Sequence, residues 1–417
     1  MNLAHELESA LLPSARGLVA RVGEASARRG YRACLVGGAV RDLMLGRSCQ
    51  DIDIIIEGDA HEVARDCTGP DDAPAVFHKA FGTATITSGQ QRIDLATARH
   101  ETYARPGALP DVRPGSIEDD LVRRDFSINA MAVMLNAEGY GNLLDPHGGR
   151  LDLEHGLLRV LHGSSFVDDA TRIFRGVRYE QRFGFVFERN TRNLLAHDVS
   201  RVADLSGARV RHEVERIMEE AEPELCFRRL DALRALDAVV PGLAFSRRQA
   251  AAMTAIRTSA PGPSSLAESF WCVLLWPVCG EGLDKLTGGL SLTRRVGAAV
   301  GDCADMVTMK EMLDRQDLAP SRVFELLHSK QSGALVAAMH LLDGAVARRH
   351  VQDYLERWRH VRTSLTGQDL RRLGFSSGPD LGRALAALRA NRLDGKVTNA
   401  EQEQALAKAL LRGTDGD

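Results

Sequence analysis

The sequence predicts an α+β fold in which a mixed α/β head is followed by an all-helical remainder. Up to about residue 150, short runs rich in β-branched residues alternate with helix-like segments, and Gly or Pro separates them. After that point strand signals almost vanish, and amphipathic stretches rich in Leu, Ala and Arg continue along the chain. A change of this kind indicates separate domains rather than one interleaved fold.

The elements expected in the head follow from these local patterns. In chain order, the sequence predicts helices over 14–29, 39–45 and 59–66, and strands over 32–36, 52–56, 75–78, 83–87, 91–96 and 130–135. The segment 99–118 contains three prolines and two glycines. It is long for a loop inside a compact domain, so we expect it to be either functional or disordered.

The length of the chain predicts several domains. Its 417 residues exceed what one ordinary hydrophobic core accommodates. We therefore expect a head over 1–150, a helical neck over 151–220, a helical body over 221–315 and a helical tail over 316–417.

The composition is typical of a globular protein, and we expect a cytoplasmic one. Hydrophobic residues make up 44% of the chain and charged residues 26%. No apolar run is long enough to span a membrane, and the segment MNLAHELESALL carries acids where a secretory signal carries bases. The seven cysteines are scattered and none forms a C-x-x-C pair, as expected for reduced thiols. The sequence gives no sign of a membrane or of an obligate protein partner.

The charge is acidic overall but basic locally. The formal net charge is −3, whereas the stretch from Arg172 to Arg216 holds ten arginines, no lysine and six acids. Arginine presents a flat, permanently charged fork that suits phosphates and base edges. Charge alone nevertheless favours a solvated helical face with salt bridges over a nucleic-acid-binding surface.

Two aspartates stand in an apolar stretch that otherwise has the pattern of a buried strand, LVGGAVRDLMLGRSCQDIDIII over 35–56. Because strand side chains alternate between faces, Asp51 and Asp53 leave one face while Ile52 and Ile54 enter the other. Two convergent carboxylates suit Mg²⁺ held together with substrate phosphates. Asp94, in the strand-like run QRIDLATAR, is the candidate for a third carboxylate. The alternative is a solvent-facing edge strand whose acids have no role.

The residues upstream of these aspartates favour the metal site. Gly37 and Gly38 end one strand and open a helix that begins Ala-Val-Arg-Asp. Glycine lets the backbone approach a ligand, and helical N–H groups suit a phosphate. Arg41, in the first turn, can add charge-assisted hydrogen bonds. The order of strand, Gly-Gly, helix and D-x-D strand predicts a metal-bound triphosphate, on which two-metal phosphoryl transfer to a hydroxyl can proceed.

A second cluster is RRDFSINA over 123–130. A double arginine before an apolar run is also what a plain helix end looks like. Asn129, however, stands in an apolar setting and needs hydrogen-bond partners. We expect a ribose or a phosphate to supply them.

A third cluster is DDATRIFRGVRY over 168–179. On a helix, steps of three residues place Asp169, Arg172, Arg175 and Arg178 on one slanting ridge. The alternative is that the first two form a surface ion pair, which is worth under about 1 kcal/mol.

In this order and spacing, the three clusters resemble the motifs of the class II tRNA nucleotidyltransferases, the CCA-adding enzymes, with their bacterial poly(A) polymerase relatives. The first motif is GGAVRDLMLGRSCQDID, the second is RRDFSINA, and the amino-acid template motif is DDATR, with Asp168 where the family usually has Glu. VRHEVERIM resembles the next helical motif, and residues 365–397 resemble the C-terminal tRNA-binding region. The close similarity covers roughly residues 32–216 and implies a polymerase-β-like nucleotidyltransferase head.

The resemblance also implies roles for individual residues. Asp51 and Asp53 would hold the catalytic Mg²⁺ ions. The residues implied in nucleotide binding are Gly37, Gly38, Arg41, Arg124, Asp125, Asn129, Arg175 and Arg178. Asp169 and Arg172 would read the incoming base. The implied substrates are CTP, ATP and tRNA.

An aspartate and an arginine can select cytosine and adenine without a nucleic-acid template. Both bases present an amino donor beside a bare ring nitrogen, so a carboxylate accepts from the first and a guanidinium donates to the second. Uracil and guanine invert both hydrogen bonds, and a site that leaves buried polar groups unpaired rejects the wrong ligand strongly.

The tail contains the residues expected to contact tRNA. Gly378 and Pro379 precede a helix expected from about Asp380, whose first N–H groups can meet a phosphate. The arginines expected to add phosphate contacts are Arg371, Arg372 and Arg383. The alternative is a helical hairpin that only packs.

CCA addition is the main prediction, and addition of A alone is the runner-up. Addition of CC alone, poly(A) polymerase activity and an inactive RNA-binding module are further alternatives. In the family, a flexible loop is needed for the switch to A addition, and CC-only enzymes tend to lack it. The loop ARHETYARPGALPDVRPGS is intact here, and its ETYARPGALP portion resembles some A-adding members. An inactive module would carry degenerate acids, whereas both acids are intact.

Overall fold

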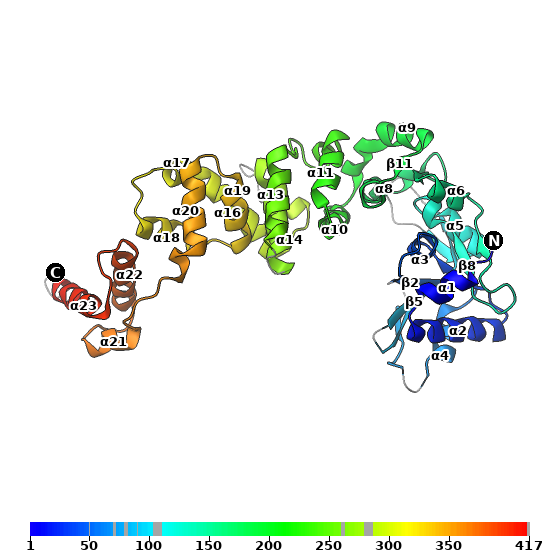
Figure 1. Ribbon diagram of the computed structural model, residues 1–417, viewed down its shortest axis with the longest axis horizontal. Helices are drawn as coiled ribbons and strands as arrows, with labels where there is room; N and C mark the ends of the chain where they lie inside the picture. The colour runs from blue at the N-terminus through cyan, green and yellow to red at the C-terminus, as the bar shows by residue number, and fades with distance from the viewer. Residues whose placement is uncertain are drawn as a thin grey trace. The chain divides into compact units, whose positions relative to one another are not determined.

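The computed structural model describes residues 1–49, 51–69, 72–78, 82–89, 91–102, 111–259, 263–278 and 287–414. The chain forms two compact units, one of Met1–Ala221 with Ala232–Val239 and one of Glu222–Asp231 with Val240–Asp417. Every strand in the described ranges lies in the first unit, and the second is helical (Figure 1). The predicted fold class is therefore confirmed, while the finer division into four domains stays a prediction.

The first unit is built on a seven-stranded sheet in the order β3-β4-β5-β2-β1-β8-β9. Strands β2 and β5 are parallel, and the other neighbouring pairs are antiparallel. The strands are β1 (Ala33–Val36), β2 (Ile52–Ile56), β3 (Val76–His78), β4 (Thr83–Ser88), β5 (Gln91–Thr97), β8 (Ala132–Met134) and β9 (Leu143–Leu144). All the strands expected in the head are confirmed, and β9 was not expected.

The segment 99–118 contains more structure than its prolines and glycines suggested. Strands β6 (Arg99–Thr102) and β7 (Asp111–Pro114) pair as an antiparallel hairpin, and α5 (Ile117–Val122) follows. A capping box between Ser116 and Asp119 fixes the start of that helix. The expected loop between the two strands, residues 103–110, lies outside the described residues.

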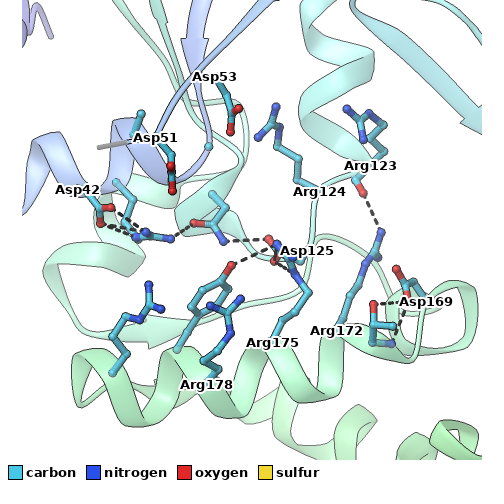
Figure 2. A pocket seen from close by; sticks show the side chains of 18 of the residues that line it. Asp42, Asp51, Asp53, Arg123, Arg124, Asp125, Asp169, Arg172, Arg175 and Arg178 are labelled. Atoms are coloured by element: carbon cyan, nitrogen blue, oxygen red, sulfur yellow. Dashed lines mark hydrogen bonds and ion pairs between the residues drawn. The ribbon is translucent and has the colours of Figure 1, made fainter. Parts of the chain in front are cut away.

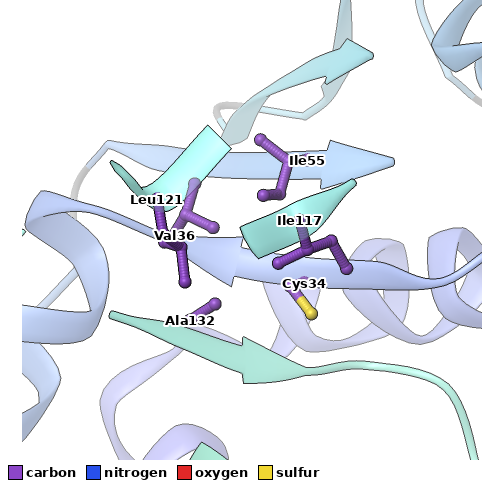
Figure 3. Packing of buried hydrophobic residues seen from close by; sticks show 6 residues of the cluster. All are labelled: Cys34, Val36, Ile55, Ile117, Leu121 and Ala132. Carbon is purple, nitrogen blue, oxygen red and sulfur yellow. The ribbon is translucent and has the colours of Figure 1, made fainter. Parts of the chain in front are cut away.

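The two faces of the sheet are covered differently. One face carries Ile52 and Ile54 of β2, which are buried, and α2 (Pro13–Arg28) and α4 (Ala60–Cys67) contact strands β4 and β5. On the other face, α5 packs over β1 and β2. Figure 3 shows the cluster that results, formed by Cys34, Val36, Ile55, Ile117, Leu121 and Ala132. Asp53 lies two residues before Ile55 and therefore leaves the sheet on the α5 face.

The remaining elements of the first unit join the sheet to the helical part of the chain. They are α1 (Ala4–Ala10), α3 (Gly38–Met44), η2 (Ser127–Asn129), α6 (Gly149–Glu154), β10 (Leu157–Leu158), α7 (Ser165–Asp168), α8 (Thr171–Phe183), β11 (Val186–Phe187), α9 (Arg189–Asp198), η3 (Val199–Asp204), α10 (Gly207–Met218) and α12 (Ala235–Val239). Helix α8 approaches closely at Gly176, where a Cβ atom would lie 2.8 Å from the rings of Phe126 and Phe187. This contact brings the arginines of α8 next to the RRDFSINA segment.

The second unit consists of short helices. They are α11 (Pro223–Ala232), which ends in the first unit, α13 (Arg247–Thr258), α14 (Pro263–Leu275), η4 (Trp276–Val278), α16 (Arg294–Thr308), α17 (Lys310–Leu313), α18 (Pro320–Leu327), α19 (Ser332–Leu341), α20 (Ala345–Glu356), η5 (Trp358–His360), α21 (Gly367–Arg372), α22 (Pro379–Leu393) and α23 (Ala400–Thr414). Helices α21 to α23 share a core around Leu370, Phe375 and Leu388. Across the described ranges, no helix is both long and apolar enough to cross a bilayer.

Candidate active site

A cavity of about 970 Å³ in the first unit brings the three sequence clusters together (Figure 2). Ten arginines and six Asp or Glu residues line it, so the cavity is basic although the chain is acidic. Such a surplus of positive charge suits a polyanionic ligand. The predicted residues that line it are Gly37, Gly38, Arg41, Asp51, Asp53, Arg124, Asp125, Asn129, Asp169, Arg172, Arg175 and Arg178.

Asp51 and Asp53 face the cavity at the start of β2, while Ile52 between them is buried on the other side of the strand. In Figure 2, both carboxylates point toward the arginines that rise from α8. Among the described residues, neither carboxylate receives a hydrogen bond or an ion pair closer than 4.0 Å. Two accessible, unpartnered carboxylates on one face fit a hard divalent cation such as Mg²⁺.

The electrostatic surroundings of Asp53 support the same conclusion. The pKa of Asp53 is raised above its usual value, first by desolvation in the cavity and then by the negative charges of Asp94 and Asp51. Arg124 and Arg92 oppose this rise. A bound cation would offset the repulsion between the carboxylates, so the site is arranged to gain from one.

Asp94 lies beside Asp53 as predicted, but its carboxylate already has partners within the protein. It pairs in register with Asp53 across β5 and β2 and therefore shares its face of the sheet. Its Oδ1 accepts a 2.5 Å hydrogen bond from Thr85 Oγ1, and Arg92 forms an ion pair with it at 3.0 Å. No group of three acidic, His or Cys side chains suited to a metal occurs in the part of the chain that the structure describes. These contacts favour a supporting role for Asp94 over that of a third metal ligand.

The two glycines create room for an arginine. Gly37 has φ 69° and precedes α3, and a Cβ atom there would lie 2.6 Å from Nη1 of Arg124. Arg124 itself is held by Asp120, which accepts its Nη2–H at 2.9 Å and is fully buried. A side chain at position 37 would therefore displace Arg124 from the edge of the cavity.

A chain of hydrogen bonds joins α3 to α8. Arg41 Nη1 donates to Asn129 Oδ1 at 2.6 Å, Asn129 Nδ2 donates to Asp125 Oδ1 at 3.0 Å, and Arg175 Nε donates to Asp125 Oδ2 at 2.7 Å. Arg41 and Asp125 thus supply partners of the Asn129 side chain within the protein, and a contact of Asn129 with a ribose or phosphate stays a prediction. Arg41 is also buried, with its guanidinium 4.7 Å from the Phe183 ring centre.

Asp125 is the charged carboxylate in this series of hydrogen bonds. Burial by itself would raise the pKa of the Asp125 carboxyl. Arg175, Asn129 and the backbone N–H of Phe126 outweigh burial and lower that pKa to about 2. Asp125 is therefore ionised at neutral pH and fixes the position of Arg175, whose pKa it raises in turn.

The expected base-reading pair has a different geometry from the one predicted. Asp169 does not lie on the helix with Arg172, because α8 starts at Thr171 and the backbone at Asp169 is extended. Asp169 Oδ1 accepts from Thr171 N at 2.9 Å and from Arg209 Nη2 at 2.7 Å. The alternative of an Asp169–Arg172 surface ion pair is not found among the described residues, since the carboxylate pairs with Arg209 instead.

Arg172 is buried and fixed by neutral oxygens. Its Nη1 donates to Ser165 Oγ at 2.5 Å, and its Nη2 donates to the carbonyl oxygen of Arg123 at 2.7 Å. The guanidinium therefore keeps its charge uncompensated by any carboxylate within the described ranges, and it lines the cavity beside Asp169. This arrangement suits a guanidinium whose remaining N–H groups address a ligand.

Sequence reasoning missed several residues of the site. Arg209 of α10 holds Asp169, and Glu101 of β6 pairs with Arg123 at 3.2 Å. Glu220 binds Arg178, and Arg182 as well. The arginine-rich stretch 172–216 was the signal for Arg182 and Arg209, but charge alone could not single them out.

The tail residues lie in the second unit and are exposed. Helix α22 begins at Pro379 after Gly378, which has φ 120°, so the predicted helix start is confirmed. Arg372 pairs with Asp369 at 3.5 Å, and Arg383 pairs with Asp380, each one turn earlier on the same helix. The shared core of α21 to α23 shows that this segment also packs, as the alternative held.

The chain is similar to known proteins over most of its length. Residues 33–159 match the family described as poly A polymerase head domain, and 184–246 match a probable RNA- and SrmB-binding site of polymerase A. An A-adding tRNA nucleotidyltransferase of Halalkalibacterium halodurans is 31% identical over 411 residues, which cover 94% of this chain and 92% of that protein. One from Geobacter sulfurreducens is 33% identical over 90% of this chain, which spans 44% of that longer protein. Other relatives are named CC-adding and CCA-adding enzymes.

Solved structures resemble the whole chain. A Thermotoga maritima CCA-adding enzyme complexed with tRNA matches with a TM-score of 0.80 and 28% identity, over 99% of both chains. Complexes of a CCA-adding enzyme with ATP and with CTP match with TM-scores of 0.82. The similarity thus extends through both compact units.

Proposed function

The chain belongs to the class II tRNA nucleotidyltransferase family, and from this we propose that it adds CMP and AMP from CTP and ATP to the 3′ end of tRNA, without a nucleic-acid template. CCA-end synthesis or repair is the main proposal. The observation that carries it is the pair of carboxylates, Asp51 and Asp53, which face an arginine-lined cavity and have no partner among the described residues. We place the enzyme in the cytoplasm.

The residues of the cavity divide the work of nucleotide binding. Arg124, Arg175 and Arg178 offer positive charge to the triphosphate. The hydrogen bonds through Asp125 and Asn129 hold α3 and α8 in position relative to each other. Because these side chains are held before the ligand arrives, little ordering is needed at the moment of reaction.

Members of this family depend on a metal ion, and we propose Mg²⁺ held by Asp51 and Asp53. When bound, it would neutralise the triphosphate and favour ionisation of the attacking hydroxyl. In the transfer, the 3′-hydroxyl oxygen of the tRNA bonds to the α-phosphorus, the bond from that phosphorus to pyrophosphate breaks, and the hydroxyl proton is released. The chain's own residues orient the two reactants and stabilise the phosphate charge.

Base selection is assigned to Asp169 and Arg172. Arg209 and Thr171 hold Oδ1 of Asp169, which leaves Oδ2 to accept from the exocyclic amino group of cytosine or adenine. Arg172, fixed by Ser165, would donate to the adjacent ring nitrogen. In UTP and GTP, the base carbonyl oxygen would face the Asp169 carboxylate, and the ring N–H would face the Arg172 guanidinium, so neither hydrogen bond could form.

Three tRNAs test this proposal, ending at the discriminator base, at C and at CC. Each is incubated with Mg²⁺ and either CTP or ATP alone, and the products are sized on a sequencing gel. CCA addition predicts growth of the first two with CTP and of the third with ATP. Incorporation into none of the three contradicts the proposal and favours an inactive RNA-binding module.

Addition of A alone is the second candidate. Similarity to A-adding relatives over nearly the full chain supports it. In the same experiment, this activity would extend the CC-ended tRNA with ATP and leave the other two tRNAs unchanged with CTP.

A further inference from the structure

The arginines that line the cavity differ in whether a carboxylate offsets their charge. Of the ten, eight form an ion pair with a carboxylate among the described residues, and they are Arg41, Arg99, Arg123, Arg124, Arg175, Arg178, Arg182 and Arg209. The other two are Arg172, which the proposed function assigns to the base, and Arg47. Arg47 thus carries a positive charge that no carboxylate in the described ranges offsets.

The end of α3 fixes the backbone at Arg47. Gly46 has φ 67°, a left-handed conformation that glycine adopts without strain. The N–H of Gly46 donates to the carbonyl oxygen of Leu43 at 3.0 Å. The N–H of Arg47 donates to the carbonyl oxygen of Asp42 at 2.9 Å. Together these two hydrogen bonds form a Schellman motif, which ends the helix. Arg47 therefore leaves α3 at a defined point, four residues before Asp51.

The partner of the Arg47 side chain comes from α8. Steps of four residues place Arg175, Tyr179 and Phe183 on one side of that helix. The rings of Tyr179 and Phe183 are stacked, with their centres 6.1 Å apart and their planes at 28°. The guanidinium of Arg47 lies 5.0 Å from the centre of the Phe183 ring. Among the described residues, no hydrogen bond or ion pair holds this guanidinium, so the ring is its partner.

An aromatic ring holds a guanidinium without neutralising it. The ring carries no net charge and attracts the cation through its quadrupole. A carboxylate also holds a guanidinium but cancels its charge, as Glu220 does for Arg182. The guanidinium groups near the Phe183 ring are those of Arg41 at 4.7 Å, Arg47 at 5.0 Å and Arg182 at 5.9 Å. Because the first and the last of these also have carboxylate partners, the ring matters most for Arg47.

The position of Phe183 along α8 indicates which part of a nucleotide meets Arg47. Arg172 lies in the first turn of α8, and Phe183 is the last residue of the helix. At a rise of about 1.5 Å per residue, they are about 16 Å apart along the helix axis. Figure 2 shows Asp169 and Arg172 at one end of α8 and Asp51 toward the other. A nucleotide whose base meets Arg172 thus extends its triphosphate toward Asp51 and Arg47.

We propose that Arg47 binds the terminal phosphates of the incoming nucleoside triphosphate and that Phe183 is its positioning residue. The inference rests on the proposed function and adds to its triphosphate site. In the transfer these phosphates leave as pyrophosphate, so Arg47 offsets charge that develops on the leaving group. CTP and ATP share the contact, because their triphosphates are alike, whereas CMP lacks it. Arg47 therefore contributes affinity without base selectivity.

Binding of nucleotides without tRNA tests the role of Arg47. Isothermal titration calorimetry on the full chain with Mg²⁺ gives the Kd of CTP, ATP, UTP and CMP. Arg47→Ala should weaken binding of CTP and of ATP about tenfold each, the loss of one charge-assisted contact. Binding of CMP and the preference for CTP over UTP should not change, and Arg47→Lys should recover part of the loss. Because Arg47 is exposed, the variants should stay folded. A loss for CMP as large as that for CTP, or no loss for either, overturns the assignment.

A double-mutant cycle separates positioning by Phe183 from a merely structural role. Phe183→Leu keeps an apolar side chain but removes the ring, and it should raise the Kd of CTP about two- to fivefold. Phe183→Tyr keeps the ring and should leave that Kd unchanged. In the Arg47→Ala background, Phe183→Leu should have little further effect, because the guanidinium that it positions is already gone. An equal effect of Phe183→Leu in both backgrounds overturns the positioning role.

Arg65→Ala is the matched control. Arg65 is an exposed arginine of α4 whose guanidinium lies 5.1 Å from the centre of the Phe77 ring, and it does not line the cavity. Its removal should leave the Kd of CTP unchanged. An unmodified protein that binds neither CTP nor ATP would refute the proposed function. An unmodified protein that extends tRNA, together with an Arg47→Ala variant that binds CTP as tightly, would overturn this inference alone.

Discussion

The arginines of the cavity and those of the tail are held in opposite ways. In the cavity, Arg41 and Arg172 are 4% exposed, and each is fixed by residues far away in sequence. In the tail, the side chains of Arg372 and Arg383 are 72% and 74% exposed, and among the described residues each forms an ion pair with an aspartate one turn earlier. The same residue type is thus buried and fixed by distant residues in one region, and exposed with a local partner in the other.

This difference matches two kinds of recognition. A site that must distinguish bases has to hold its hydrogen-bond donors and acceptors in place before the ligand arrives. If one of these groups is misplaced, the site no longer discriminates between the bases. A surface that follows a nucleic-acid backbone needs positive charge but little geometry, because phosphates are alike along the strand. Substitutions in the cavity should therefore have large, specific effects, and those in the tail small, general ones.

The largest effect should come from the cavity's carboxylates. Asp51→Ala and Asp53→Ala should each lower kcat by about 1000-fold or more, because a metal ligand is lost in a reaction that relies on the metal for charge stabilisation. Incorporation of labelled ATP into CC-ended tRNA measures this. Asp317→Ala removes an exposed carboxylate paired with Arg315 in the second unit and should leave the rate unchanged. Near-normal turnover in either cavity variant would remove the two-metal mechanism.

The next effect concerns base selection. Asp169→Ala should lower the preference for CTP and ATP over UTP and GTP by about 10- to 100-fold, because one of the two discriminating hydrogen bonds is lost. Competition between labelled nucleotides measures this ratio. Arg209→Ala should give a weaker loss of the same kind, since Arg209 holds the carboxylate in place. Equal weakening of all four nucleotides, with selectivity unchanged, would contradict the base-reading role.

A subtler effect concerns pH. Arg124 lowers the pKa of Asp53 and Asp94 raises it. If catalysis needs the ionised carboxylate, Arg124→Gln should move the acid limb of the kcat/KM profile to higher pH, and Asp94→Asn should move it to lower pH. The midpoint of the limb is the measurement, since Arg124→Gln also lowers the maximal rate. A loss of activity in Asp94→Asn as large as that of Asp53→Ala would instead make Asp94 a third metal ligand.

The sequence predicted the parts of this molecule that local chemistry determines. The head strands are runs of β-branched residues, and their pattern alone located β1 to β5 and β8. The two-residue strands β9, β10 and β11 were missed, because so short a segment carries no alternation and is defined by its partner. The β6–β7 hairpin was missed because its prolines and glycines mask the pairing.

The residues of the site also divide into those that the sequence predicted and those that it did not. Residues of contiguous motifs, such as Asp51 and Arg124, were predicted because each motif is a local unit. Their supporting partners were not, because Arg209 lies 40 residues from Asp169, and tertiary packing alone brings them together. The side chain of Asn129 shows the same limit, since a need for partners was evident but their identity was not.

The smallest effect should come from the tail. Replacing Arg371, Arg372 and Arg383 together by Ala should weaken tRNA binding only about three- to tenfold at low salt. Each lost phosphate contact should reduce the slope of log K against log salt by about 0.7 to 0.9. The core around Leu370 and Leu388 is untouched, so the segment should stay folded, and ATP binding should not change. Filter binding of labelled tRNA over a salt series measures both quantities.

Two further variants decide between phosphate contacts and simple packing in the tail. Arg322→Ala is the control, because Arg322 is an exposed arginine of the same unit that pairs with Glu325 three residues later, as the tail arginines pair with their aspartates. It should leave the salt slope unchanged. Deletion of 365–417 should give a larger loss of affinity than the triple substitution and spare ATP binding. A folded truncated protein that binds tRNA as tightly, with the same slope, would mean that the tail only packs and that exposed arginines are not sufficient for binding.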